Sequence, residues 1–217
     1  MDDFSVTERT KVRRKPQRGH YDRETVYAIL DEALYCHVAI VEAGKPVVVP
    51  TAHWRSGDRL YLHGSKMSRL LRALSQGVEA CVAATLIDGV VLARSGFHSS
   101  VNYRSVLVFG RAEAVPGRAG KEAAMRSFME SLAPGRWDEL RPPTKKEIDA
   151  TTVVMFALDE ASAKVREGPP VDDETDYAAD VWAGVVPLAL VRGEPVPDPR
   201  LKPGIAPPAY LDGRGRL

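Results

Sequence analysis

The residues of this chain with the clearest potential for chemistry are Ser65, Lys66, Ser68 and Arg69. They follow an alternating run over residues 59–63 and a glycine, a pattern that predicts a strand, a turn and a helix start capped by Ser65. The apolar face of this helix is predicted to contain Met67, Leu70, Leu71 and Leu74. Free N–H groups at a helix start favour an anion, and nearby hydroxyls and cations add to that preference. The segment is predicted to bind the phosphate of a cofactor, although an ordinary solvated helix start has the same pattern.

Two other polar stretches suit a ligand site. Ser100, Asn102 and Tyr103 supply several donors at the entrance of an apolar strand, as expected for a polar ligand or for a satisfied surface turn. A valine-rich strand before them contains Pro50 and Thr51. Proline cannot donate to a ladder, so this position marks an edge, a bulge or a contact with another molecule.

Composition restricts the class of protein. Hydrophobic residues make up 44% and charged residues 27% of the 217-residue chain, which is typical of a globular protein. The net charge of +1 provides no general attraction for nucleic acid. No apolar run approaches the ~18 residues of a membrane span, and the charged N-terminus lacks the apolar region of a signal peptide, so we expect a cytoplasmic protein. Cys36 and Cys81 lie in apolar runs without metal-ligand spacing, and no metal site is predicted.

The elements that must position these residues are predominantly strands. Asp22 is predicted to cap a helix, and strands are predicted over 35–42, 46–54, 79–87, 90–93, 103–115, 151–158 and 162–166, with a turn at Asp88-Gly89. Thr144 and Glu147 have the spacing of a capping box. Strands without βαβ alternation favour an antiparallel β-barrel with peripheral helices. We predict a basic, solvated N-terminal arm over 1–19, one domain over 20–192 and a proline-rich extension over 193–217.

Three stretches resemble the pyridoxamine 5′-phosphate oxidase-like family of FMN-binding split barrels, in particular its flavin-nucleotide-binding and nitroimidazole-resistance (Nim-like) branch. They are HYDRETVYAILDEA at 20–33, LYLHGSKMSRLLRAL at 60–74 and VNYRSVLVFGRAEAV at 101–115. The resemblance covers roughly residues 20–190 and implies a mainly β, Greek-key split barrel. It also implies a homodimer with FMN at the interface.

Carried over position by position, the resemblance implies a set of cofactor-binding residues. These are Val49, Pro50, Thr51, Leu62, His63, Ser65, Lys66, Ser68, Arg69, Ser100, Asn102, Tyr103 and Trp182. His63 lies beside the flavin in this comparison and is the candidate catalytic proton donor or acceptor. The oxidase's substrate-binding arginine and histidine motif has no counterpart near Arg192, which argues against pyridoxamine phosphate as the substrate.

The sequence therefore predicts an FMN-dependent oxidoreductase acting on a small organic acceptor, with nitroaromatics as one candidate class. Two alternatives stay open: a flavin-binding storage or sensor module without turnover, and a haem-binding split barrel with His37, His53, His63 or His98 as axial ligand. The deazaflavin F420 is an alternative cofactor, because the same phosphate site would accept it. Nucleic acid and membrane partners are not expected.

Overall fold

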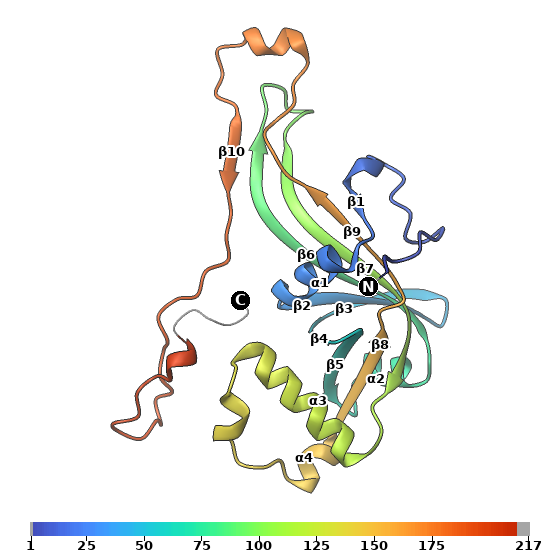
Figure 1. The fold of residues 1–217 in the computed structure, drawn as a ribbon, viewed down its shortest axis with the longest axis vertical. Helices are drawn as coiled ribbons and strands as arrows, with labels where there is room; N and C mark the ends of the chain where they lie inside the picture. Colours follow the sequence, from blue (N-terminus) through green and yellow to red (C-terminus); the bar gives the residue numbers. More distant parts are fainter. Residues whose placement is uncertain (1, 212–217) are drawn as a thin grey trace. The chain divides into compact units, whose positions relative to one another are not determined.

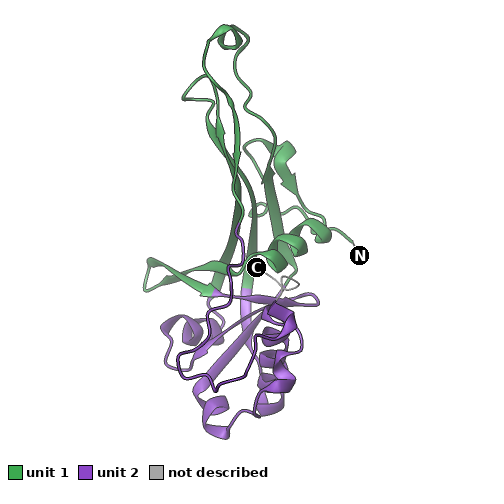
Figure 2. Ribbon diagram, turned by 90° about the vertical axis from the view of Figure 1, so that its left-hand side faces the viewer, with its two compact units in different colours: residues 1–51, 79–110, 158–189 green, residues 52–78, 111–157, 190–217 purple. Residues whose placement is uncertain are grey.

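The structure, a computed structural model, describes residues 2–211 and contains two compact units (Figures 1 and 2). Unit 1 comprises residues 1–51, 79–110 and 158–189, and unit 2 comprises 52–78, 111–157 and 190–217. Every strand pair with a defined register is antiparallel, as predicted. None of the described helices is long and apolar enough to cross a membrane.

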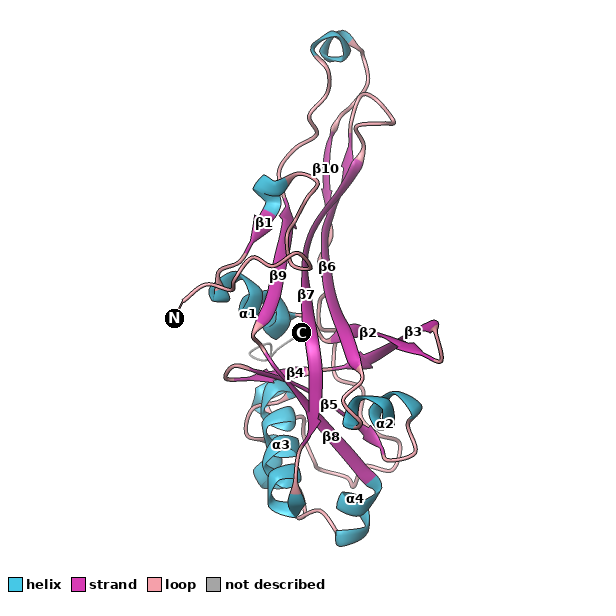
Figure 3. Cartoon of the chain, turned by 90° about the vertical axis from the view of Figure 1, so that its right-hand side faces the viewer, coloured by secondary structure: helices cyan, strands magenta, loops and turns pink. Residues whose placement is uncertain are grey.

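Unit 1 is organised around the long neighbouring strands β6 and β7 (Figure 3). Its elements are η1 (Pro16–Arg18), β1 (Gly19–His20), α1 (Arg23–Glu32), β2 (Tyr35–Glu42), β3 (Lys45–Ala52), β6 (Glu79–Leu92), β7 (Ser100–Ala114), β9 (Glu160–Arg166), η3 (Glu174–Ala178) and β10 (Gly184–Pro187). Strand β2 pairs with β6, and β9 lies between β7 and β1. Alternating residues of these strands are buried because one face of each strand packs against the core.

Helix α1 forms where the sequence predicts it. The Asp22 carboxylate accepts a hydrogen bond from Thr25 N at 2.7 Å, which satisfies one of the free donors at the helix start. Val26, Ile29 and Leu30 are buried, and the helix lies against β6 and β9. The i, i+3, i+4 spacing of these residues thus covers the core of unit 1.

The predicted turn at Asp88-Gly89 is wrong, because β6 continues through it to Leu92. The Asp88 carboxylate accepts hydrogen bonds from Arg104 of β7, and its carbonyl accepts one from Leu188 N at 3.0 Å. Gly89 lies opposite Pro187 of β10. Tertiary partners on both sides therefore keep this dipeptide extended.

Unit 2 combines a smaller sheet with three helices of the described chain. Its elements are β4 (Trp54–Ser56), β5 (Arg59–Ser65), α2 (Arg69–Ser75), α3 (Gly117–Leu132), η2 (Arg136–Glu139), α4 (Lys145–Ala150), β8 (Thr151–Ala157) and η4 (Ala209–Leu211). Strand β5 lies between β4 and β8, and residues 112–114 of β7 extend this sheet beside β8. The predicted capping box of α4 is confirmed, since Thr144 and Glu147 each bond the other's backbone N–H.

The two terminal segments make specific contacts. Phe4 and Thr10 are buried, and Arg9 forms ion pairs with Glu79 and Glu160, so the segment predicted as a solvated arm belongs to unit 1. In unit 2 the Tyr210 hydroxyl accepts from Arg136 and donates to Glu139. The last six residues of the predicted extension, 212–217, lie outside the described chain.

Candidate functional site

The segment predicted to bind phosphate has a different local structure from the one expected. Strand β5 continues through Ser65, and α2 begins only at Arg69, with Ser68 and not Ser65 as its N-cap. Ser68 Oγ accepts from Leu71 N at 3.4 Å, and Ser65 Oγ accepts from Met67 N at 3.2 Å. Both hydroxyls thus bond the local backbone.

The side chains of this segment divide into two groups. Ser65, Lys66 and Arg69 are exposed and Ser68 is half-buried. Met67 is 70% exposed, so its assignment to the apolar face was wrong, whereas Leu70, Leu71 and Leu74 are buried as predicted. The shift of the cap by three residues explains this, because Met67 precedes the helix. Binding of a phosphate by this segment stays a prediction.

His63, the predicted catalytic residue, lies in an aromatic cluster of unit 2. Its ring centroid is 4.6 Å from that of Phe128 on α3 and 5.6 Å from that of Trp54. Trp54 is fully buried, stacks on Tyr61 at 5.3 Å and donates from Nε1 to Ser127 Oγ at 2.8 Å. The alternation of β5 places Tyr61 and His63 on this side and the buried Leu62 on the other.

The imidazole of His63 lacks a polar partner among the described residues. Its Nδ1 atom is buried and accepts or donates no hydrogen bond. Burial lowers the pKa of His63 below its ordinary value, so the ring is neutral at pH 7. A neutral, half-buried imidazole with an unused nitrogen is suited to bind a metal centre or to exchange a proton.

The other histidines have different surroundings. His53 is 1% exposed and therefore inaccessible, and His37 is exposed on β2. His20 lies 3.9 Å from an Asp22 oxygen, and His98 lies 3.7 Å from one of Asp172. Among the candidate axial ligands, His63 alone combines partial burial with an apolar, aromatic environment in the described chain.

The predicted site residues of unit 1 lie on β3, on β7 and before β10. Val49 and Thr51 are half-buried and Pro50 is exposed on β3. Ser100 is exposed and Tyr103 half-buried on β7. Their contact with a cofactor stays a prediction.

Trp182 and Asn102 have evident structural roles. Trp182 is 64% exposed, and its ring lies over the Cα of Gly184, where any added Cβ would come within 2.8 Å. Asn102 is buried; its amide donates to Gly168 O at 3.1 Å and accepts from Arg166. Arg166 itself was missed by the sequence analysis, because nothing local distinguishes it from a surface residue of a strand.

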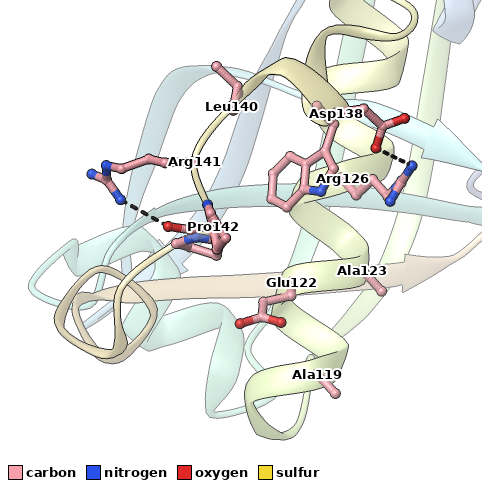
Figure 4. Close-up of a pocket in the computed structure, with 10 residues that line it drawn as sticks. Ala119, Glu122, Ala123, Arg126, Asp138, Leu140, Arg141 and Pro142 are labelled. Atoms are coloured by element: carbon pink, nitrogen blue, oxygen red, sulfur yellow. Dashed lines mark hydrogen bonds and ion pairs between the residues drawn. The ribbon is translucent and has the colours of Figure 1, made fainter.

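A surface pocket of about 460 Å³ lies between α3 and the segment 137–143 of unit 2 (Figure 4). None of the predicted site residues lines it. Arg126 pairs with Asp138, and Arg141 donates to the Pro142 carbonyl and pairs with Glu147. Its arginines are therefore already neutralised by protein partners.

A group of three potential metal ligands, which the sequence analysis did not predict, occurs in unit 1. Donor atoms of His98, Asp172 and Asp176 lie within 4.8 Å of one another. The Asp172 carboxylate, however, accepts hydrogen bonds from the Arg94 guanidinium and from the backbone N–H groups of Arg94 and Ser95. Arg94 neutralises the charge of this carboxylate. An ion-paired contact between loops is therefore enough to explain why the three side chains lie close together.

The chain is similar to solved structures over almost its whole length. It is 45% identical to the flavocytochrome Anf3 from Azotobacter vinelandii, with a TM-score of 0.90 and coverage of 95% of this chain and 96% of the other. It is 39% identical to an FAD and heme binding protein from Mycobacterium smegmatis, with a TM-score of 0.87 and coverage of 92% and 98%.

A family comparison agrees with these matches. A sequence model described as pyridoxamine 5′-phosphate oxidase matches residues 22–165. A proposed 5-nitroimidazole antibiotic resistance protein from Bacteroides thetaiotaomicron shares the fold at 22% identity and a TM-score of 0.57, covering 68% of this chain and 86% of the other. No curated protein matches the sequence. The predicted split β-barrel, mainly antiparallel with peripheral helices, is confirmed.

Proposed function

Because the chain belongs to the pyridoxamine 5′-phosphate oxidase family, as the resemblance predicted, we propose that it is a redox protein that binds both a flavin and haem. The observation that carries this proposal is 45% identity over 95% of the chain to a flavocytochrome. The FAD and heme binding protein at 39% identity supports the same pair of cofactors. Haem, predicted only as an alternative, thus becomes part of the main proposal.

The residues of unit 2 fit a haem ligand. A histidine that binds iron must be neutral and must have a nitrogen free of protein hydrogen bonds. His63 meets both conditions, since burial lowers its pKa and no described residue hydrogen-bonds its imidazole; because Nδ1 is itself buried, Nε2 is the nitrogen that would reach the iron. Trp54 and Phe128 beside it supply the apolar surface that shields such a centre from water. We therefore propose His63 as the residue that would bind the haem iron.

When bound, the flavin would supply hydride or two-electron chemistry and the haem one-electron chemistry. The protein's own contribution is to bind, orient and shield these groups. In unit 2, Ser65, Lys66, Ser68 and Arg69 are the proposed phosphate contacts of the flavin. In unit 1, Val49–Thr51, Ser100 and Tyr103 are proposed cofactor contacts, whereas both polar atoms of the Asn102 side chain are bonded to protein. His63 is the proposed iron ligand; the alternative role is proton donor to the flavin, and a single substitution separates the two.

The test begins with the absorption spectrum of the purified protein before and after addition of haem, followed by mass identification of any released flavin. We expect a flavin spectrum from FAD or FMN and, with haem, a Soret band of protein-bound haem that is shifted and sharpened relative to free haem. His63→Gln should abolish the Soret band and leave flavin retention unchanged. The exposed His37 provides the matched control, so His37→Gln should behave like the unaltered protein.

Each outcome has a defined meaning. Absence of both flavin and a Soret band would refute the proposed function. A Soret band that survives in His63→Gln would refute the ligand assignment. Loss of flavin reduction by NAD(P)H in this variant, with haem binding intact, would instead support the role of His63 as a proton donor.

Activity and assembly are further parts of the proposal. Reduction of a small organic acceptor, including a nitroaromatic, is tested by NAD(P)H oxidation in the presence of that acceptor. Release and mass analysis of the bound cofactor would reveal the deazaflavin F420 if it replaced the flavin. The proposed homodimer is tested by measuring the molar mass of the holoprotein in solution.

A further inference from the structure

Arg166 is an almost buried cation at the end of β9 in unit 1. It is 7% exposed and lies opposite Tyr103 in the antiparallel register of β7 and β9. Among the described residues its acceptor is Asn102 Oδ1, a neutral amide oxygen. Because the Asn102 amide also donates to Gly168 O, its orientation is fixed with the oxygen toward the guanidinium. A guanidinium has five N–H donors, so most of the donors of Arg166 are not bonded by the described residues.

The charge of Arg166 is not balanced by a carboxylate. Buried charges in folded proteins are usually paired, because removal of an ion from water is costly. No ion pair joins Arg166 to any carboxylate of the described chain, in contrast to Arg104, which pairs with Glu32 and Asp88. Burial, and then the positive charge of Arg18, lower the pKa of Arg166.

The fold brings Arg18 to this position from the other end of the sequence. Strand β1 begins at Gly19, which lies opposite Lys164 of β9, so the residue before it is near the end of β9. Arg18 is half-buried and forms no ion pair with a described carboxylate. The positive charge of Arg18 therefore acts on Arg166, and an anion between the two side chains would stabilise both.

We propose that Arg166 and Arg18, oriented by Asn102, form a binding site for an oxyanion of a phosphate or carboxylate group. Arginine binds such groups through parallel N–H donors, and two arginines match the two negative charges of a diphosphate. This site belongs to unit 1 and contains none of Ser65, Lys66, Ser68 and Arg69, the residues predicted to bind phosphate. It goes beyond the proposed function, because it requires an anion but not a particular cofactor.

The same chemistry could come from two sources. The diphosphate of a dinucleotide flavin such as FAD has the charge for both arginines, and a haem propionate offers one carboxylate. Inorganic pyrophosphate is therefore the first probe, and FAD, FMN and haem are the comparison ligands. Loss of FAD affinity without loss of FMN affinity in the variants below would identify the diphosphate, and loss of haem affinity alone would identify a propionate.

The experiment measures thermal unfolding of the full chain with increasing pyrophosphate. Binding to the folded state alone raises the midpoint in a concentration-dependent way, and added salt should weaken the effect. Arg18→Gln and Arg166→Met should each weaken pyrophosphate binding about tenfold to a hundredfold, the range for a lost charge-assisted contact. Arg18→Gln leaves the Arg166–Asn102 bond intact and keeps the test valid if Arg166→Met does not fold.

Arg13 provides the matched control. It lies in the same basic stretch but pairs with Glu8 and is exposed, so Arg13→Gln should respond to pyrophosphate like the unaltered protein. If the purified protein already retains a dinucleotide, the readout becomes retention of that dinucleotide, which Arg18→Gln should reduce and Arg13→Gln should not. The proposal is overturned if Arg18→Gln and Arg166→Met match the unaltered protein in both pyrophosphate response and retention. A pyrophosphate response without flavin or haem would support this site while the proposed function fails.

Discussion

Gly89→Ala tests the finding that β6 runs through the Asp88-Gly89 dipeptide and pairs with β10. A Cβ at this position would come within 2.9 Å of Val185 Cγ1 and within 3.1 Å of Val186 O. The second contact is with backbone, so β10 itself must shift. Overpacking of this kind costs about 1–3 kcal/mol, whereas Gly→Ala gains about 0.4–1 kcal/mol by restricting the unfolded chain. We expect a net loss of about 1.3 kcal/mol in the free energy of unfolding from the midpoints of these ranges, and of at most about 2.6 kcal/mol.

A local readout shows where this loss occurs. The amide of Leu188 donates to Asp88 O at 3.0 Å, so its hydrogen exchange reports whether the end of β10 remains on β6. In Gly89→Ala the peptide covering residues 184–188 should exchange faster, because four residue pairs of β10 are weakened together. Urea unfolding gives the global free energy, and exchange measured by mass spectrometry gives the local one.

Gly96→Ala is the matched control. Nothing lies within 4 Å of a Cβ at position 96, which belongs to the connection between β6 and β7. This variant should keep or slightly increase stability, by at most about 1 kcal/mol. If Gly89→Ala unfolds at the same urea concentration as Gly96→Ala and residues 184–188 exchange at an unchanged rate, the pairing of β10 with β6 is refuted.

Three further predictions concern the N-cap of α1 and the aromatic cluster around His63. Ser127→Ala leaves the buried indole N–H of Trp54 without its acceptor and should lower the free energy of unfolding in urea by about 1–3 kcal/mol. A loss below about 0.5 kcal/mol would argue against that hydrogen bond. Asp22→Ala should cost about 0.5–2 kcal/mol at pH 7. Because the hydrogen bond from Thr25 lowers the pKa of Asp22 below 3.8, this cost should disappear as pH falls through the folded-state value, and a cost that persists in acid would contradict the cap. Burial lowers the pKa of folded-state His63 below the ordinary value of 6.5. The unfolded chain therefore binds a proton more readily than the folded chain, and the cofactor-free protein should lose stability as the pH falls below 6.5. His63→Gln should remove this part of the pH dependence of the unfolding midpoint, and an identical pH profile in the variant would contradict it.

Local signals in the sequence predicted local structure well. The N-cap Asp22 and the capping box of Thr144 and Glu147 need only contacts three residues apart, and both are confirmed. The strand predicted over 35–42 is likewise confirmed as β2. These features form within a single element, so the sequence contains the information that determines them.

Features that depend on distant partners could not be predicted in this way. Asp88-Gly89 has the composition of a turn, but contacts from Arg104 and from β10 hold it in a strand. The basic N-terminal segment was expected to be solvated, yet Arg9 pairs with Glu79 and Glu160, which are 70 and 151 residues away. Helix periodicity placed Met67 in an apolar face, although the cap at Ser68 excludes it from the helix.

The candidate site shows the same division. The family resemblance identified His63, and the structure adds that its surroundings are aromatic and that its Nδ1 is unused. Arg166 was missed because its partner Asn102 is 64 residues away and Arg18 lies at the start of the chain. An unpaired buried charge is visible only when all neighbours are known.

His63 and Arg166 present the same physical problem in two separate units. Folding normally satisfies buried polar groups, because each one left without a partner costs about 1–3 kcal/mol or more. The Nδ1 atom of His63 is buried without a partner in the described chain, and Arg166 carries a charge that no described carboxylate balances and has a positive neighbour. The two groups need opposite partners, since a neutral imidazole nitrogen binds a metal and a guanidinium binds an oxyanion. A protein that binds haem and a phosphorylated flavin would provide both partners, and loss of either residue should therefore reduce the stability of the cofactor-loaded protein more than that of the cofactor-free chain.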